Sequence, residues 1–395
     1  MTSSEPRILL TSARMPFAVD EVRKLGLDMG HYLVATDTFK ESPGLHSKGV
    51  SKRVITAPPT QEPDAFVDDV IKIIDDEEIS IVLPAFEEVF YLAANRAKIQ
   101  EGRDVTLFFP ELDALLEVND KTVFAALCKR LDLPVAETIV CTTAEEFVAA
   151  TQKWDNWFAR AAFGRGGLDI ITNTGPLAGE TAVEDIKPTT EDPWLVQEFL
   201  DGTDRCSWSV VHEGEVVLHS CYEHPLSIDD RGGIVFQSVD TDASLAAVQK
   251  IAKELNWTGQ ISMDYLVTED GTHYMVECNP RPTAGCTIAT AEEFDKALFD
   301  PDGLVVVEPG RKRSIRVAVV RDALKHPRKL REDHAIAKGS SPVYAQPNDI
   351  MPLVYSALSL RHVLAYRRVA GKERSKEQLV AAQFFDILYD GSPLK

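Results

Sequence analysis

The sequence predicts an α/β domain at the N-terminus, then two α+β domains, and a C-terminal extension of mixed structure. Short apolar runs alternate with segments of helical spacing over roughly the first 115 residues, which is typical of a small parallel sheet. From about residue 135 the apolar runs follow one another with glycines between them, which favours strands joined by turns. The predicted domains span residues 1–115, 116–192, 193–305 and 306–395.

The first domain is predicted to contain four strands and two helices. No GxGxxG motif follows the first strand, so a dinucleotide site is not expected there. Glu87 and Glu88 follow the third strand, at the end where α/β sheets usually bind ligands, and they could meet a cationic amine. A solvated loop is the favoured interpretation of this pair. The strands are residues 7–11, 31–37, 80–84 and 106–110, and the helices are 18–29 and 64–74.

Later elements are predicted from caps and spacing. Asn119-Asp120 caps a helix over 121–131, and Pro134 marks the end of that segment. Apolar residues at 245, 248, 252 and 255 keep helical spacing. A last helix over 375–388 begins with the capping box Ser375-x-x-Gln378. The strands expected between them lie within 138–142, 157–171, 194–200, 207–214 and 215–223.

Composition and charge argue against a membrane protein, a nucleic-acid-binding protein and a disulfide-bonded protein. The chain of 395 residues is 44% hydrophobic, and no run approaches ~18 apolar residues, so neither a membrane span nor a membrane partner is expected. The net charge of −20 disfavours nucleic acid. Six cysteines form no CxxC pair, which indicates reduced thiols, and no basic leader precedes the first strand. We therefore expect a cytoplasmic protein with small-molecule partners.

The stretch VECNPRP at 276–282 carries Glu277, Asn279 and Arg281 at alternate positions. It follows Asp270-Gly271, a strong signal for a two-residue hairpin turn. With that turn Asp264 faces Glu277, and one face of the hairpin carries most of its polar groups. The same pairing sets Leu266 opposite Met275 and Thr268 opposite His273, and it leaves Tyr265, Val267, Tyr274, Val276 and Cys278 on the other, apolar face.

Two opposed carboxylates would repel each other unless a cation lay between them. Asp264, Glu277 and Asn279 supply the hard oxygen ligands that suit Mg²⁺, whose shell phosphate oxygens and water complete. Arg281 would neutralise a substrate anion or a developing oxyanion. Leu266 and Met275 would form the apolar floor of the cavity. The alternative is an exposed sheet face whose polar groups only meet water.

Three further stretches carry phosphate-binding or nucleotide-binding chemistry. The glycine-rich run Ala162–Gly167 would let main-chain N–H groups close over phosphates, although an ordinary hairpin turn has the same pattern. Arg160 and Lys121 would face the phosphates as cations. The strand WLVQEFL runs into a linker that offers main-chain groups to an adenine edge and carboxylates to ribose hydroxyls. Those carboxylates are Glu198, Asp201 and Asp204, and each is more often simply solvated.

Together and in this order, these motifs resemble the ATP-grasp superfamily over roughly residues 1–290. The matching positions are Asp120-Lys121, Arg160 before FGRGG, QEFLDG at 197–202, and Asp264 with ECNPR at 277–281. The resemblance implies an N-terminal α/β domain followed by α+β subdomains that clamp ATP. It implies a magnesium site at Asp264, Glu277 and Asn279, and an adenine hinge at Gln197, Glu198, Phe199 and Leu200, with Glu198 or Asp204 on the ribose. The phosphates would be held by Lys121, Arg160, Gly164, Arg165, Gly166 and Gly167.

The expected activity is an ADP-forming ligation of a carboxylate to an amine through an acyl phosphate, with ATP and two magnesium or manganese ions. Most members have lysine where Arg160 stands, whereas carbamoyl-phosphate synthetase-like members have arginine. Phosphorylation of bicarbonate or carbamate is therefore one alternative, and a nucleotide-binding scaffold without chemistry is another. The resemblance also makes a homodimer a fair expectation.

The residues that would select the acceptor are less defined. Thr283-Ala284-Gly285 could form a main-chain pocket for a carboxylate. Nine Lys or Arg residues between Arg311 and Arg331 are interpreted as a solvated face, ahead of a subunit contact or a lid. The polar candidates on the central sheet, each more often structural than functional, are His219, Tyr222, His224, Arg231 and Gln237.

Overall fold

The computed structural model describes residues 5–164, 169–175, 177–228, 232–326, 328–370, 383–389 and 391–394. The chain divides into two compact units. The first comprises Met1–Leu112, Ser207–Ser262 and Pro280–Lys395, and the second comprises Asp113–Cys206 and Met263–Asn279. Strands β10 (Thr203–His212) and β13 (Gly259–Val267) each continue along the chain from one unit into the other.

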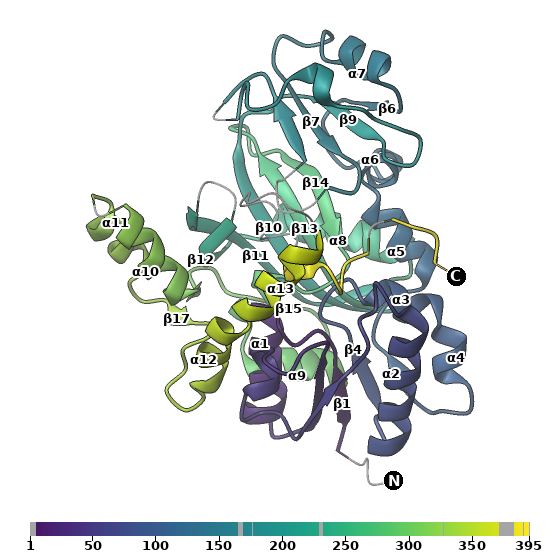
Figure 1. Cartoon of the computed structure of the whole chain (residues 1–395). Coiled ribbons are helices and arrows are strands. Elements are labelled where there is room, and N and C mark those ends of the chain that lie inside the picture. The colour runs from purple at the N-terminus through teal and green to yellow at the C-terminus, as the bar shows by residue number, and fades with distance from the viewer. Residues whose placement is uncertain are drawn as a thin grey trace. The chain divides into compact units, whose positions relative to one another are not determined.

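The parallel sheet that the alternating pattern predicted forms the N-terminal part of the first unit, with five strands where four were predicted (Figure 1). Its order is β3-β2-β1-β4-β5, so the first strand lies at the centre. Apolar residues Ile8–Leu10 of that strand are fully buried, which explains the continuous run of apolar residues in its sequence. The strands are β1 (Arg7–Leu10), β2 (Tyr32–Asp37), β3 (Lys52–Ile55), β4 (Ile81–Leu83) and β5 (Thr106–Leu107).

Over residues 5–111 the structure has four α-helices, whereas two were predicted, over 18–29 and 64–74. The helix predicted over 18–29 is an α-helix, α1 (Pro16–Val22), followed by a π-helical turn over Arg23–Asp28. Pro16 at the start of α1 suits the first helical turn, where the missing N–H costs nothing. Three further helices contact one another on this part of the unit: α2 (Pro63–Glu77), α3 (Val89–Ala94) and α4 (Arg96–Gln100).

A second, larger sheet follows the order β14-β13-β10-β11-β12-β16-β17, with β15 beside β11. Helix α8 (Asp242–Glu254) contacts β11 and realises the spacing seen at residues 245–255. A capping box at Thr290 begins α9 (Ala291–Phe299). The remaining strands are β11 (Glu215–Ile228), β12 (Gly232–Val239), β14 (His273–Asn279), β15 (Val305–Val306), β16 (Lys312–Ser314) and β17 (Ser341–Pro342).

The C-terminal part contributes four helices to the first unit: α10 (Arg316–Lys325), α11 (Leu330–Ala337), α12 (Met351–Leu358) and α13 (Leu360–Ala370). Most of the last helix that the sequence predicted, over 375–388, falls on residues 371–382, which lie outside the described residues. Within the described part of the extension, the first basic residues are engaged inside the unit. Arg311 donates to both oxygens of Glu293, and Arg313 pairs with Asp20, so the interpretation as a solvated face is wrong for these two.

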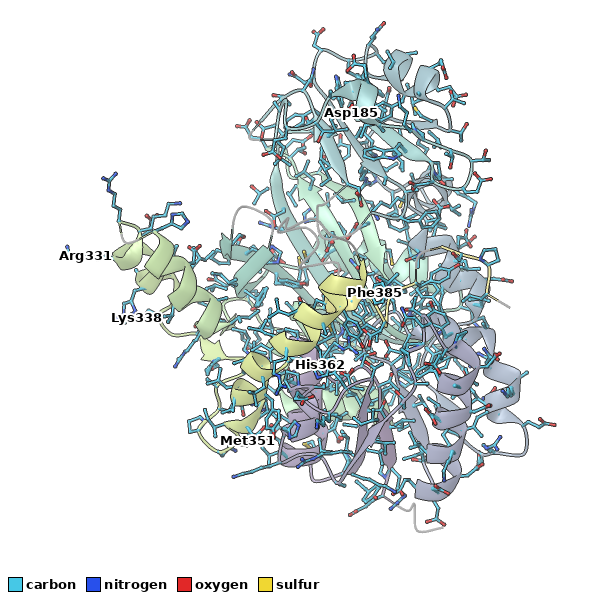
Figure 2. The ribbon with its side chains drawn as sticks, in the orientation of Figure 1. Asp185, Arg331, Lys338, Met351, His362 and Phe385 are labelled. Atoms are coloured by element: carbon cyan, nitrogen blue, oxygen red, sulfur yellow. The ribbon has the colours of Figure 1, made fainter. Side chains whose placement is uncertain are left out.

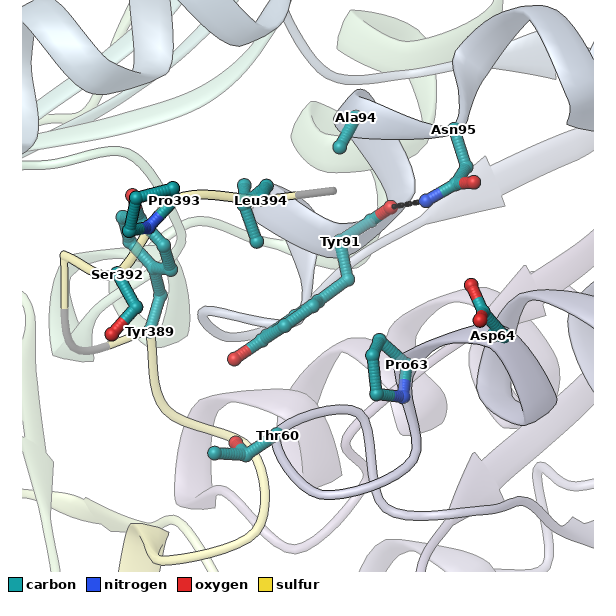
Figure 3. Close-up of a pocket in the computed structure, with 10 residues that line it drawn as sticks. All are labelled: Thr60, Pro63, Asp64, Tyr91, Ala94, Asn95, Tyr389, Ser392, Pro393 and Leu394. Atoms are coloured by element: carbon teal, nitrogen blue, oxygen red, sulfur yellow. Dashed lines mark hydrogen bonds between the residues drawn. The ribbon is translucent and has the colours of Figure 1, made fainter.

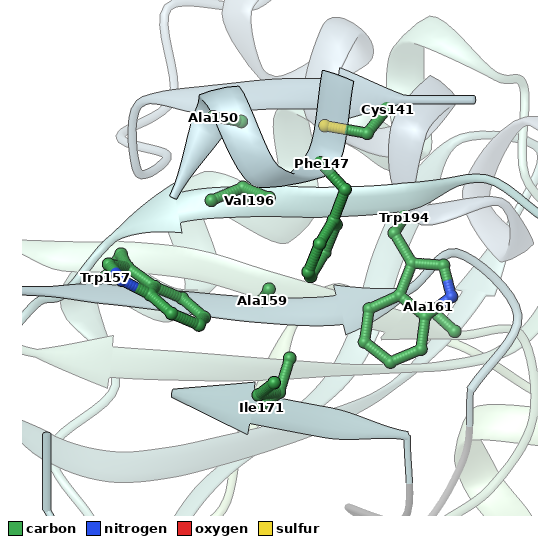
Figure 4. Close-up of a cluster of buried hydrophobic side chains, with 9 residues drawn as sticks. All are labelled: Cys141, Phe147, Ala150, Trp157, Ala159, Ala161, Ile171, Trp194 and Val196. Atoms are coloured by element: carbon green, nitrogen blue, oxygen red, sulfur yellow. The ribbon is translucent and has the colours of Figure 1, made fainter. Parts of the chain in front are cut away.

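The second unit is built on an antiparallel sheet of order β6-β9-β7-β8. Helix α7 (Ala144–Ala150) packs on it through Phe147, whose ring meets Trp194 edge-on at 5.6 Å (Figure 4). Helices α5 (Leu112–Asn119) and α6 (Lys121–Arg130) precede the sheet. Its strands are β6 (Thr138–Cys141), β7 (Trp157–Ala161), β8 (Ile170–Thr172) and β9 (Trp194–Glu198).

All six cysteines are buried and none forms a disulfide. Among the described residues, no helix has both the length and the apolar character that crossing a membrane requires.

Candidate functional site

The loop between β13 and β14 is one residue longer than the two-residue turn that the sequence predicted at Asp270-Gly271. Gly271 has φ 82° and donates to the carbonyl of Thr268 at 2.9 Å, while Thr268 donates to Thr272 at 3.1 Å. The loop therefore has three residues, 269–271, and the pairing of Thr268 with His273 is wrong. Because side chains alternate along a strand, the shift changes the faces beside the turn, where the rings of Tyr265 and His273 meet at 5.8 Å.

At the other end of the hairpin, the three predicted metal ligands come together. The amide nitrogen of Asn279 lies 3.4 Å from Asp264 Oδ2 and 3.4 Å from Glu277 Oε1. Both carboxylates therefore converge on one point, and that point is occupied by the amide. All three residues are half-buried, so solvent and small solutes reach them.

Two cations of the same unit flank this group. Asp120 caps α6 by accepting from the N–H groups of Thr122 and Val123, which fixes the start of the helix and thereby Lys121. Lys121 Nζ lies 3.4 Å from Glu277 Oε2 and donates to the carbonyl of Gly164 at 2.8 Å. The lysine thus links β14, which carries Glu277, to Gly164 within the glycine-rich run.

Arg160, on β7, is the second cation. The residue is buried, with 7% of its surface exposed, and its guanidinium donates through Nη2 to the carbonyl of Val276 at 2.8 Å. Its Nε is also buried and has no hydrogen-bond partner among the described residues. A buried donor without a partner costs free energy, so this N–H is suited to an anionic ligand.

The pKa of Glu277 and the pKa of Arg160 each depend on burial and on the charged groups nearby. Burial opposes ionisation of Glu277, but the charges of Lys121 and Arg160, with a hydrogen bond donated by Asn279, outweigh it and hold the pKa of Glu277 well below its ordinary value. Burial lowers the pKa of Arg160, while Glu277 and Asp264 oppose that shift. The carboxylate of Glu277 is therefore ionised and 30% exposed, the state that a cation requires.

The glycine-rich run is only partly described. Gly164 is placed, and a Cβ at this position would lie 3.1 Å from the Cβ of Asp169, so a larger residue would crowd the start of the run. Arg165, Gly166 and Gly167, which we expected to cover phosphates, lie outside the described residues.

Several polar groups of the predicted adenine hinge, at the end of β9, form hydrogen bonds with neighbouring residues of the protein. Gln197 is buried and donates to Thr138 Oγ1 at 2.8 Å. The N–H of Glu198 donates to the carbonyl of Glu137 at 3.1 Å, and its Oε1 accepts from the N–H of Glu137 at 3.0 Å. The N–H of Phe199 donates to Asn156 at 3.1 Å. Adenine contacts from this segment would therefore begin at Leu200.

The apolar floor lies beside the hinge. Gly202 approaches Leu266 so closely that a Cβ on the glycine would lie 3.0 Å from Leu266 Cγ. Met275 is buried, and its N–H donates to the carbonyl of Pro134 at 2.8 Å. Asp204, the second carboxylate proposed for ribose, is exposed at the start of β10.

Arg281 belongs to the other unit, where its guanidinium carbon lies 4.6 Å from the centroid of the Phe86 ring. Within that unit, His219 does not face an acceptor site. It is fully buried between Ser209 Oγ at 2.8 Å and Ser244 Oγ at 2.9 Å, and burial lowers its pKa to about 3. Gly285 packs against Trp208 and Tyr222, where a Cβ would meet the Tyr222 ring at 2.6 Å.

The other residues predicted to contact the acceptor are found in different parts of the chain's structure. Tyr222 and His224 lie ring to ring at 5.5 Å, and Gln237 is half-buried on β12. Arg231 lies outside the described residues. The favoured interpretation of Glu87 and Glu88 as a solvated loop is wrong, because both are buried. Glu88 accepts from the N–H of Ala85 at 3.0 Å, and Glu87 from the N–H of Tyr389 at 2.9 Å.

Two contributors to the site were missed from the sequence. The carbonyls of Gly164 and Val276 hold the two cations, and main-chain groups carry no signal in residue type. Among the described residues, no group of three or more His, Cys, Asp or Glu side chains gathers as a metal cluster. The two carboxylates are fewer than such a cluster needs, and they match the one or two carboxylates that Mg²⁺ usually takes.

A scan against known protein families finds no match for this chain. Solved structures do match it. The biotin carboxylase domain of the Hydrogenobacter thermophilus 2-oxoglutarate carboxylase, solved with MgADP, ADP and bicarbonate, is 16% identical with a TM-score of 0.59, over 78% of this chain and 74% of that one. The N5-carboxyaminoimidazole synthetase of Staphylococcus aureus is 12% identical with a TM-score of 0.60, over 83% and 86%.

Phosphoribosylamine–glycine ligase from Thermotoga maritima is 14% identical with a TM-score of 0.57, over 78% of each chain. These three proteins are ATP-grasp enzymes, and the likeness to each extends over most of this chain. At identities of 12–16%, the structural similarity shows a shared fold alone. The chain described here has the ATP-grasp fold.

Proposed function

We propose that this protein is an ADP-forming, magnesium-dependent ligase that joins a carboxylate to an amine through an acyl phosphate. The observation that carries the proposal is the meeting of Asp264 and Glu277 on one point, beside Lys121 and the buried Arg160. The ATP-grasp fold and the neighbours solved with MgADP or an ATP analogue support it.

The donor set fits magnesium. Asp264 and Glu277 would hold the metal, and Asn279 would join them by turning its amide so that Oδ1 replaces Nδ2, an exchange that leaves the shape of the side chain unchanged. Magnesium held by these residues (two ions, with Mn²⁺ as a substitute) would supply positive charge to the β- and γ-phosphates of ATP. This would relieve the repulsion between the two carboxylates.

The protein's own groups have separate roles in the proposal. Arg160 directs its unpartnered Nε–H at a phosphate oxygen, and Lys121 exchanges the carbonyl of Gly164 for another. The run Gly164–Gly167 covers the phosphates and excludes water from the acyl phosphate. Leu266 and Met275 support the adenine beside Leu200, and Glu198 or Asp204 binds the ribose. Arg281 stabilises the oxyanion that forms when the amine attacks.

The test is the dependence of ADP release on both acceptors. With ATP and Mg²⁺, a panel of small carboxylic acids and amines should release ADP and phosphate only when the matching acid and amine are both present. Hydroxylamine in place of the amine should trap the acyl phosphate as a hydroxamate. ADP that forms without any acceptor dependence, with no hydroxamate trapped, would contradict the ligase, and tight ATP binding without turnover would favour a scaffold.

Arg160 favours a second candidate, the phosphorylation of bicarbonate or carbamate. Arginine clamps phosphate through two N–H groups but does not serve as a proton donor. The Hydrogenobacter neighbour was solved with bicarbonate as well as MgADP. Release of ADP that requires bicarbonate and no other acid would support this reaction. Release that continues after bicarbonate is removed would exclude it.

A further inference from the structure

The C-terminal segment Gln383–Tyr389 lies on the loops that follow three adjacent strands of the parallel sheet. After β1, Arg14 binds Asp386; after β2, Thr38 binds the same carboxylate. After β4, the Phe86 ring stacks on Phe384 at 4.9 Å. The carboxyl ends of parallel strands are where open α/β sheets bind ligands. The segment therefore occupies the edge at which a ligand is expected, and all of these residues belong to one unit.

The carboxylate of Asp386 is fully buried in a cradle of side-chain donors. Arg14 Nη1 donates to Oδ1 at 2.6 Å and Nη2 donates to Oδ2 at 3.1 Å. Tyr366 lies on α13, the helix that also carries His362, which Figure 2 labels. Its hydroxyl donates to Oδ2 at 2.9 Å, and Thr38 Oγ1 donates to the same oxygen. Two hydroxyls and a two-pronged guanidinium thus bind one planar carboxylate, the arrangement with which proteins recognise a carboxylic acid.

The cradle does not need Asp386 for charge balance. Asp37 already pairs with Arg14, whose Nε donates to Asp37 Oδ1 at 2.9 Å. Asp386 adds a second negative charge to a buried group that holds one positive charge. The charge of Arg14 and the hydrogen bonds together hold the second carboxylate, and a carboxylate from another molecule would receive the same charge and the same hydrogen bonds.

The segment borders unfilled space at Tyr389. A cavity of about 280 Å³ lies beside it, with Tyr91 and Asn95 of α3 and its flank on one side and Tyr389 and Ser392–Leu394 on another (Figure 3). Thr60 lines this cavity, and its N–H donates to the carbonyl of Asp386 at 3.2 Å. Unfilled space next to a segment reduces the contacts that are lost when it moves.

We propose that Arg14, Thr38 and Tyr366 form a binding subsite for a small carboxylic acid, and that Asp386 is an internal competitor that fills it. A free carboxylate takes the place of Asp386, and the segment Gln383–Tyr389 leaves the edge of the sheet. No bond is made or broken in this exchange. Binding here requires neither ATP nor Mg²⁺, so its failure would leave the proposed ligase activity untouched.

The test measures acetate and succinate binding to the full chain by thermal shift, at ionic strength held constant with sodium chloride. Asp386→Ala vacates the cradle and should bind acetate about tenfold more tightly than the wild type, because the competitor is gone. The double variant Arg14→Met/Asp386→Ala should show no gain. Asp349→Ala is the matched control, because Asp349 is an equally buried partner of another arginine, Arg23, and its other partners are Ser47 and Lys48.

A second readout keeps the test decisive if Asp386→Ala does not fold. Hydrogen–deuterium exchange over 383–389 should quicken in the wild type when succinate is added, and in Asp386→Asn without it. The proposal is overturned if acetate binds Asp386→Ala and Asp386→Asn no better than the wild type. It is also overturned if succinate leaves hydrogen–deuterium exchange over 383–389 unchanged in the wild type. It is equally overturned if Asp349→Ala gains as much affinity, or if inorganic phosphate is bound as well as acetate.

Discussion

Glu277 is the residue on which the proposed chemistry depends most. It is ionised because two cations of its own unit stabilise the carboxylate, and part of its side chain is exposed. The same cations would be needed by the phosphates of a nucleotide. Binding of MgATP would therefore exchange protein partners for ligand partners at Lys121 and Arg160, with the metal taking over their role toward Glu277.

Glu277→Gln should lower the rate of Mg²⁺-dependent ADP release by about two orders of magnitude, because a neutral amide is a poor ligand for a hard cation. The measurement is ADP release at saturating ATP over a magnesium titration. Glu269→Gln is the control, since Glu269 is exposed in the turn of the same hairpin. Equal rates for wild type and Glu277→Gln would remove Glu277 from the metal site.

At the scale of elements, helix α1 is unusual in its buried charges. Asp20 and Glu21 are both buried in its last turns. Asp20 pairs with Lys24 at 2.7 Å and with Arg313, whereas burial raises the pKa of Glu21 to about 8 against the opposing effects of Gln260 and Lys24. The helix thus packs at neutral pH with Glu21 protonated.

Because the folded state binds this proton more tightly than the unfolded chain, stability is fully present below the ordinary pKa of a glutamate. It is lost as the pH rises toward about 8 and beyond. Glu21→Gln should therefore raise the melting temperature by several degrees at about pH 9 and change it little at about pH 4. Thermal unfolding across this range checks it. A constant difference between the two proteins at every pH would show that Glu21 does not titrate in this window.

The 3-10 helix Ala284–Ile288 follows the hairpin and packs through its glycine. A Cβ at Gly285 would lie 2.6 Å from the Tyr222 ring and 2.7 Å from Trp208 Cβ, and both aromatic residues are buried. Gly285→Ala should therefore cost about 1–3 kcal/mol in the free energy of unfolding, as overpacking does. Urea unfolding measures it. Gly303→Ala is a control for the substitution itself, because open space surrounds that position, although its φ of 80° adds local strain.

At the scale of the whole molecule, the C-terminal part is tied to the N-terminal sheet by buried ion pairs that join residues far apart in sequence. Arg23 is buried and donates through Nε to Asp349 at 2.8 Å, and Asp349 also accepts from Ser47 Oγ at 2.7 Å and from the N–H of Lys48 at 3.0 Å. Arg14 with Asp386 is the second such pair. These two pairs hold described residues of the C-terminal part against the first unit.

Asp349→Asn should lower the free energy of unfolding by about 3–5 kcal/mol, because it leaves the Arg23 charge buried without its counter-ion. Denaturant unfolding checks the size of the loss. Lys72→Met breaks an exposed pair with Asp76 and should change stability by less than about 1 kcal/mol. Similar losses of unfolding free energy in Asp349→Asn and Lys72→Met would mean that the buried Arg23–Asp349 pair stabilises the fold no more than the exposed Lys72–Asp76 pair does.

The sequence by itself determined the features that depend on near neighbours. Alternation of apolar strands with helices gave the parallel sheet, Asp120 gave the start of α6, and Asp270-Gly271 gave the position of the hairpin. It also brought Asp264, Glu277 and Asn279 together, because strand periodicity places them within one hairpin. The loop length was one residue in error because the same dipeptide serves two-residue and three-residue loops.

Only the tertiary structure decided which groups those residues meet. The carbonyls that hold Lys121 and Arg160, the burial of Glu87 and Glu88, and the cradle around Asp386 all join segments that are distant in the chain. Local patterns report the period of an element and its caps, whereas a contact between distant segments depends on how whole elements pack. For that reason an acidic pair after a strand looked solvated in the sequence and is buried in the fold.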